Sequence, residues 1–210
     1  SAWPRDVYRV RIKARKGGNT SGWAVSEEFG SGICKVMIQG RPEIYGRIQQ
    51  AVDAAVSNDV IVVSDGVYNE GVRGPGIFSE EGLLIPKPMV IRGGWNGDFT
   101  AQTGETVVRN TSANGVGITV TGGGISEFGK GTIIEGLTVA GCDEYGVYFI
   151  AEPSDGSRPG VGLILRNCVV AGNGSSGICL WKHTDWVLSD VVESCTIVGN
   201  GGHGVHTYAE

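Results

Sequence analysis

The chain has 210 residues, enough for one sizeable core or one long array of repeats. Gly accounts for 36 of them, more than twice the usual share of about 7%, but without the period of three that collagen requires. A hydrophobic content of 40% excludes a disordered chain, and a formal net charge of −5 gives no general attraction to nucleic acid. No apolar run reaches the roughly 20 residues of a membrane-spanning helix, so we expect no membrane span.

Residues 1–43 are predicted to form an N-terminal β segment. Apolar and charged side chains alternate over residues 6–15, and this period of two is typical of a strand with one solvent-exposed face. A second strand is predicted over residues 33–38. Over residues 44–56 the apolar residues recur at helical spacing, which predicts a short capping helix. Two strands around a turn follow over residues 59–70, and another is predicted from Met89 to Ile91.

The second half of the chain contains a repeat. Residues 133–149, 164–180 and 191–207 align without gaps at offsets of 31 and 27 residues. Each copy contains two Gly at fixed places, and interior Gly costs a helix about 1 kcal/mol, so we predict two short strands around a Gly-rich turn in each copy. Such a unit buries its apolar face only against the next copy, which predicts a solenoid. The predicted inward columns are Ile134/Leu165/Val192, Leu137/Cys168/Cys195 and Val139/Val170/Ile197.

Several segments resemble the pectate-lyase-like right-handed parallel β-helix proteins. Residues 48–70 are similar to a capping helix that leads into a first coil, with a Gly66-x-Tyr68-x-Glu70 turn, and residues 90–99 resemble a second coil. Asn167, Asn173 and Asn200 occupy places where that family often stacks Asn. The resemblance covers roughly residues 44–208. It implies an all-β fold, with a right-handed parallel β-helix over residues 44–210, but no single activity, because this fold hosts lyases, hydrolases, epimerases, adhesins and spacers.

The last residues, 206–210, are still in repeat register and show no C-terminal cap. An uncapped coil exposes a strand edge and an apolar core. We therefore expect the β-helix either to continue in a longer chain or to stack on another subunit through its open end.

Two rows of side chains are predicted to point outward from the strands that follow the second Gly column. Alternation places Tyr148, Cys179 and His206 in one row and Ile150, Trp181 and Tyr208 in the next. Exposed aromatic rings offer a platform on which the C–H faces of sugar rings pack, so Tyr148, Trp181, His206 and Tyr208 are the predicted carbohydrate-binding residues. The alternative is that residues 151–160 and 182–190, both long enough, cover the rows.

An enzymatic alternative uses residues in or beside these two long connections. A uronate lyase needs a base and a cation that neutralises the substrate carboxylate. Lys182 or His183 could supply the base, while Asp155 and Asp185 could hold Ca²⁺. Against it, the acids are scattered and the Arg-x-Pro-x-x-Arg arrangement of the lyases is absent. No CxxC occurs among the five Cys, so we expect no zinc site.

The sequence favours a non-catalytic extracellular or cell-surface module for glycan or protein contact or for structural spacing, with no cofactor and with a polysaccharide or a surface protein as partner. The alternatives are an enzyme that acts on acidic polysaccharide, with Ca²⁺, and a filament subunit that assembles end to end. A basic residue and two or three carboxylates converging on one face would favour the enzyme.

Overall fold

The computed structural model describes residues 34–70, 81–121, 131–151, 162–182 and 190–209, and the backbone of six short strands between residues 7 and 30. The chain divides into two compact units, Ser1–Ile33 and Cys34–Glu210. The boundary lies ten residues before the expected one at 43/44, because β7 (Val36–Ile38) pairs with a strand of the second unit. None of the helices in the described part of the chain is long and apolar enough to cross a bilayer.

The first unit is a set of nested antiparallel pairs, in agreement with an N-terminal β segment. β1 pairs with β6, β2 with β5 and β3 with β4, so the chain folds back on itself. Two of the described strands, β1 and β2, lie within the predicted strand over residues 6–15, and β3 begins at its last residue. The six strands are β1 (Val7–Tyr8), β2 (Arg11–Ile12), β3 (Arg15–Lys16), β4 (Asn19–Thr20), β5 (Ala24–Val25) and β6 (Phe29–Gly30).

The described residues of the second unit form three sheets. Sheet 1 consists of β7, β8 (Ile44–Tyr45), β9 (Val60–Ser64), β12 (Val90–Trp95), β15 (Ile133–Glu135), β18 (Ile164–Arg166) and β21 (Val191–Glu193). Sheet 2 consists of β10 (Gly66–Asn69), β13 (Thr106–Arg109), β16 (Leu137–Ala140), β19 (Val169–Ala171) and β22 (Thr196–Val198). Sheet 3 consists of β11 (Glu81–Ile85), β14 (Val116–Thr121), β17 (Val147–Ala151), β20 (Ile178–Lys182) and β23 (Val205–Ala209).

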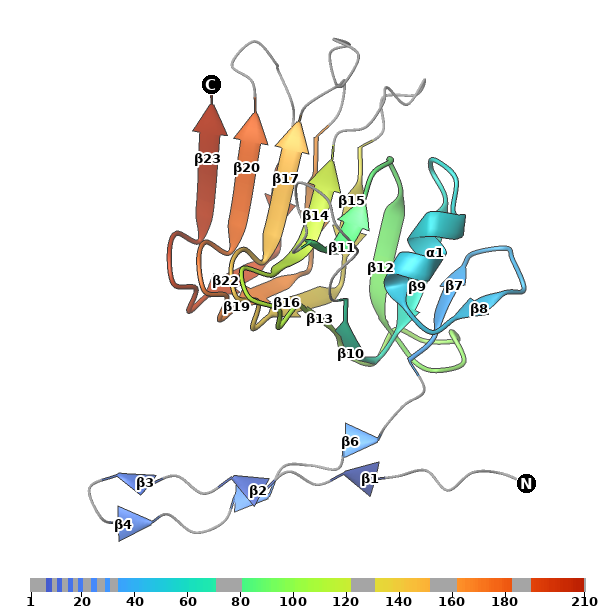
Figure 1. The fold of residues 1–210 in the computed structure, drawn as a ribbon. Coiled ribbons are helices and arrows are strands. Elements are labelled where there is room, and N and C mark those ends of the chain that lie inside the picture. Colours follow the sequence, from blue (N-terminus) through green and yellow to red (C-terminus); the bar gives the residue numbers. More distant parts are fainter. Residues whose placement is uncertain are drawn as a thin grey trace. The chain divides into compact units, whose positions relative to one another are not determined.

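Each coil of the chain contributes one strand to each sheet, in the order sheet 1, sheet 2, sheet 3. Strands of successive coils are parallel and lie side by side, as Figure 1 shows for β14, β17, β20 and β23. Among the described strands of the second unit, β7 and β8, at the edge of sheet 1, are the ones that pair antiparallel. This confirms the predicted parallel β-helix, and the three repeats pair in the register that their alignment predicts.

Single residues in the left-handed conformation turn the chain from sheet 1 into sheet 2. Gly136, Asn167 and Ser194 hold these places in three successive coils, with φ of +67°, +51° and +54°. Asn tolerates this conformation better than most residues. Asn167 therefore belongs to this turn, whereas Asn173 and Asn200 lie in the turn from sheet 2 into sheet 3. There the side-chain amide of Asn173 donates to Oδ1 of Asn200 at 2.9 Å, so the stacked pair exists as expected, without Asn167.

The second Gly column is required by close approach between coils. A Cβ added to Gly146 would lie 2.7 Å from the carbonyl oxygen of Gly177, and one added to Gly177 would lie 2.9 Å from that of Gly204. The column continues backwards through Gly117 and Gly82, whose added Cβ atoms would meet the backbone of the next coil in the same way. Sequence alignment found three members of a column that has five in the described coils.

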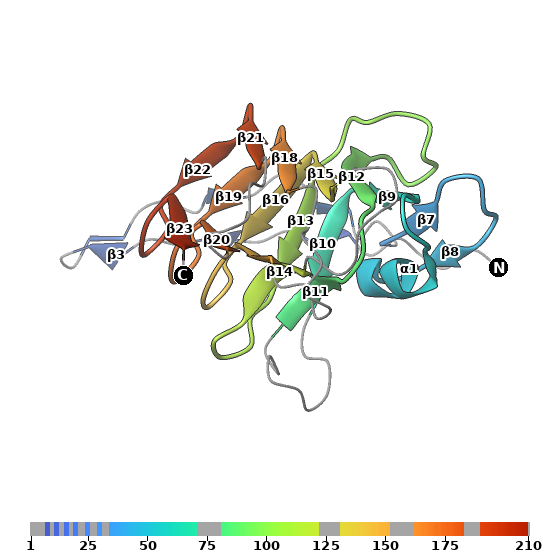
Figure 2. The same cartoon turned by 90° about the horizontal axis from the view of Figure 1, so that it is seen from above.

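Helix α1 (Ile48–Ala54) packs against β7, β9 and β11 at the end of the stack where β9 lies (Figure 2). Its inward side chains, Ile48, Ala51 and Val52, are fully buried. The predicted helix over 44–56 was too long. Ile44 and Val56 fit the helical period, yet they are 52% and 59% exposed and lie outside the helix.

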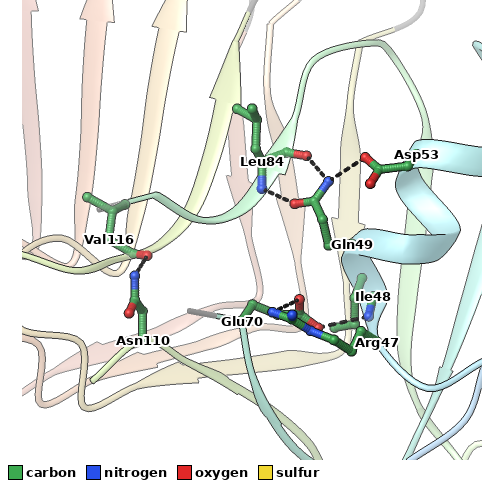
Figure 3. A network of polar contacts seen from close by, with 8 residues as sticks. All are labelled: Arg47, Ile48, Gln49, Asp53, Glu70, Leu84, Asn110 and Val116. Carbon is green, nitrogen blue, oxygen red and sulfur yellow. Dashed lines mark hydrogen bonds and ion pairs between the residues drawn. The ribbon is translucent and has the colours of Figure 1, made fainter. Parts of the chain in front are cut away.

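The Gly-x-Tyr-x-Glu turn fastens this helix to the first coil (Figure 3). Oε1 of the buried Glu70 accepts a hydrogen bond from the backbone N–H of Ile48 at 2.8 Å, and Oε2 lies 3.3 Å from the guanidinium of Arg47. The side chain of Gln49 pairs with the backbone of Leu84, accepting its N–H at 2.7 Å and donating to its carbonyl at 3.0 Å. Glu70 and Gln49 therefore satisfy backbone groups that the helix and β11 would otherwise leave unpaired.

Candidate functional site

The register of sheet 3 brings the predicted aromatic side chains together. Tyr148 pairs with Cys179 and Cys179 with His206, while Ile150, Trp181 and Tyr208 form the row two residues on. Val147, Phe149, Ile178 and Leu180, which alternate with them, lie in the core, so both rows point outward.

Two further rings border these rows. Tyr145 and His203 occupy the turn position directly before Gly146 and Gly204. Their ring contacts continue onto the sheet: Tyr145 stacks on Tyr148 with centroids 5.4 Å apart, and His203 meets His206 edge to face at 4.8 Å. The ring of His206 in turn lies 4.1 Å from that of Tyr208. We call this surface the aromatic face; it consists of Tyr145, Tyr148, Trp181, His203, His206 and Tyr208.

In the aromatic face, accessible rings lie beside side chains that are buried. Tyr208 is 43% exposed and His203 is exposed, while the other four side chains are half-buried. Ile150 is buried, and Cys179 is 0% exposed although its side chain lies on the outer side of the sheet. Cys179, which lies between Tyr148 and His206 in register, is therefore covered, whereas the rings beside it are accessible in part or in full.

Cys179 is not an exposed thiol. Burial, helped by the negative charge of Glu144, raises its pKa to about 11, which disfavours the nucleophilic thiolate. Burial also raises the pKa of Tyr145, with the same carboxylate among the further causes, so its phenol keeps its proton and can donate a hydrogen bond. The chemistry that this surface offers is therefore binding through ring faces and neutral donors.

Neither Tyr145 nor His203 was among the carbohydrate-binding residues predicted from the sequence. Both stand in one column of the repeat alignment, with the buried Ser176 between them. The signal that could have identified them is their spacing: each lies three residues before an outward aromatic residue, Tyr148 or His206, across a Gly turn. A chain that turns so tightly keeps both rings on the same side.

The predicted catalytic residues cannot be assembled into a site. Asp155, His183 and Asp185 lie outside the described residues, and of Lys182 only the backbone is described, in register with Ala151 and Ala209. Their roles stay predictions. Within residues 34–70, 81–121, 131–151, 162–182 and 190–209, no three His, Cys, Asp or Glu side chains form a group that could hold a metal ion.

The outer face of sheet 1 has a different chemistry. Arg92, Glu135, Arg166 and Glu193 form one outward row in register. Arg92 pairs with Glu135 at 3.2 Å and Arg166 with Glu193 at 3.0 Å. Exposed pairs of this kind contribute about 0–1 kcal/mol each, so the row is a modest structural ladder whose carboxylates are already engaged.

Comparison with protein families gives one match. The model of a right-handed β-helix region matches residues 90–210, more than half of the chain. Comparison with curated proteins and with solved structures gave no match.

Proposed function

Because the chain belongs to the right-handed β-helix family, we propose that it is a non-catalytic module, extracellular or at a cell surface, that binds a polysaccharide through the aromatic face. The observation that carries the proposal is the continuous set of ring contacts from His203 through His206 to Tyr208. Tyr148, with Tyr145 stacked on it, lies two strands away in the same sheet. The fold supplies a rigid scaffold and does not itself specify a ligand.

The physical reason is that a sugar ring is amphipathic. Its C–H faces pack on aromatic rings, while its hydroxyl groups need hydrogen-bond partners around the rings. The aromatic face provides both, since the tyrosine hydroxyls and the imidazoles of His203 and His206 carry donors and acceptors beside the ring faces. Strands of a sheet lie about 4.8 Å apart, so the rings follow one another along the stack at a spacing that suits an extended chain better than a globular ligand.

Tyr208 is the side chain that tests this proposal. An aromatic side chain offers roughly 150–250 Å². Tyr208 is 43% exposed, so a sugar could cover on the order of 65–110 Å² of it, worth about 2 kcal/mol at roughly 25 cal/mol per Å². We therefore expect Tyr208→Ala to weaken binding at least tenfold.

The experiment is affinity electrophoresis of the chain in gels that contain neutral or acidic polysaccharides. We expect one polysaccharide to retard the wild-type chain. The dissociation constant that this retardation gives should rise at least tenfold in Tyr208→Ala and in Tyr148→Ala. Ile44→Ala is the matched control, because Ile44 is 52% exposed and belongs to β8 of sheet 1. Equal retardation of the tyrosine variants and this control would refute the role of the aromatic face.

The same polysaccharides test the enzymatic alternative. Incubation with and without Ca²⁺, read by the ultraviolet absorbance of unsaturated products, should give no product. Product formation that a chelator abolishes would replace our proposal by a lyase and direct mutagenesis to Lys182, His183, Asp155 and Asp185. End-to-end assembly through an open coil stays a separate prediction, which light scattering of dilute protein tests.

A further inference from the structure

A second surface of the molecule has the features of a ligand site, at the edge between sheets 1 and 2. Later coils cross this edge through one or two residues, whereas residues 96–105 form a longer connection between β12 and β13. Oδ1 of Asn96 accepts the N–H groups of Thr100 at 2.9 Å and Ala101 at 3.3 Å. Nε2 of Gln102 donates a hydrogen bond to the carbonyl of Gly93 at 2.7 Å, and this bond holds the connection against β12.

This connection and the two following coils enclose a shallow pocket of about 320 Å³. Four glycines, Gly93, Gly94, Gly104 and Gly136, contribute to its lining. At Gly136 an added Cβ would lie 3.3 Å from both Nε2 of Gln102 and the carbonyl oxygen of Gly93. A side chain at Gly136 would therefore press on Gln102, which lines the pocket.

The polar groups of the pocket come from Gln102, Glu105, Thr138 and Asn167, and Val169 adds an apolar wall. The hydroxyl of Thr138 donates to Oε1 of Glu105 at 2.9 Å, which orients the carboxylate and leaves Oε2 for a ligand. Within the described part of the chain no ion pair engages Glu105, and the lining contains no Lys, Arg or His. The pocket thus carries one uncompensated negative charge between two side-chain amides.

We propose that this pocket binds a hexose-sized ligand with a protonated amine, that is, an amino sugar. Small-molecule sites range over about 300–1,000 Å³, so the pocket is large enough for one ring. The carboxylate of Glu105 attracts an ammonium group and repels the carboxylate of a uronate. The amides of Gln102 and Asn167 pair with hydroxyl groups, and Val169 faces the C–H side of the ring.

This site is separate from the aromatic face, which lies on the outer side of sheet 3. The two sites also select differently: the pocket favours a cationic unit, whereas the aromatic face binds through ring faces and neutral donors. The failure of either one therefore leaves the other standing.

Isothermal titration of the whole chain with glucosamine, glucose and glucuronate tests the proposal. We expect glucosamine to bind at least tenfold more tightly than glucose, and glucuronate most weakly. Glu105→Gln keeps the shape of the side chain and should remove the preference for glucosamine. Glu43→Gln, which neutralises an exposed acid between β7 and β8, should leave it unchanged, as should Tyr208→Ala.

An amide spectrum of the ¹⁵N-labelled wild-type chain gives a second measurement that needs no variant. Glucosamine should shift the amide resonances of Gly136, Thr138 and Asn167 more than those of other residues. Three results would overturn the proposal: glucosamine binding that Glu105→Gln does not reduce, shifts confined to other residues, or a simple alkylamine that binds as tightly as glucosamine, which would show that the pocket reads the ammonium group alone.

Discussion

Asn173→Ala should be among the most destabilising Ala substitutions in this chain. Its side chain is only 2% exposed and lies between two coils. Oδ1 accepts the backbone N–H of Cys142 at 3.0 Å, while Nδ2 donates to Oδ1 of Asn200 at 2.9 Å and to the carbonyl of Val139 at 3.4 Å. One amide therefore links three successive coils.

The magnitude follows from these contacts. Asn173→Ala removes the acceptor of a buried N–H, which costs about 1–3 kcal/mol, and the hydrogen bond to Asn200, which contributes about 1 kcal/mol. We expect the free energy of unfolding to fall by about 2–4 kcal/mol. With a urea m-value of about 2 kcal/mol per molar, the middle of the usual range, the midpoint of urea unfolding should fall by about 1–2 M.

Urea unfolding followed by circular dichroism measures this change. The matched control is Asn69→Ala, because Asn69 is exposed on β10 and makes one long contact of 3.5 Å with Thr111. It should stay within about 0.5 kcal/mol of the wild type. If both variants unfold at the same urea concentration, the amide does not link the coils and the reasoning is refuted.

Two further predictions concern the packing of the coils. Gly177→Ala should lower the free energy of unfolding by about 1–3 kcal/mol, because its Cβ would lie 2.7 Å from Nδ2 of Asn200. The control is Gly46→Ala, which should be neutral because nothing lies within 4 Å of an added Cβ there. Thermal unfolding of the two variants measures the difference. Burial raises the pKa of Cys168 to about 11, so between about pH 8.5 and 11 the folded state keeps a proton that the unfolded state has lost. Stability should therefore fall as the pH rises through this window, with a shallower slope in Cys168→Ala; equal slopes in urea titrations at each pH would contradict the assignment.

The stacked architecture could be predicted from the sequence because identical kinds of residue recur in columns. The aligned segments 133–149, 164–180 and 191–207 contain no internal insertions, so their alignment gives the register directly. In the coils before them, the connection over residues 96–105 interrupts the offset. Gly82 and Gly117 were therefore not recognised as members of the second Gly column, although they meet the next coil as closely as the others.

Other features could not be predicted, because the sequence pattern does not contain the neighbours. Alternation placed Cys179 on the outer side of sheet 3, but it does not show that the side chain is fully covered there. The helical period included Ile44 and Val56, which only tertiary packing excludes from the helix. The pocket at Glu105 could not be predicted for the same reason. Its polar groups come from three coils, and no sequence motif contains them together.

The most direct test of the proposed function is hydrogen–deuterium exchange of the whole chain with and without the polysaccharide that retards it most. A ligand on the aromatic face should slow exchange in Val147–Ala151, Ile178–Lys182 and Val205–Ala209, the three strands of sheet 3 that carry the rings. Protection confined to sheet 1 or sheet 2, with these strands unchanged, would contradict the account.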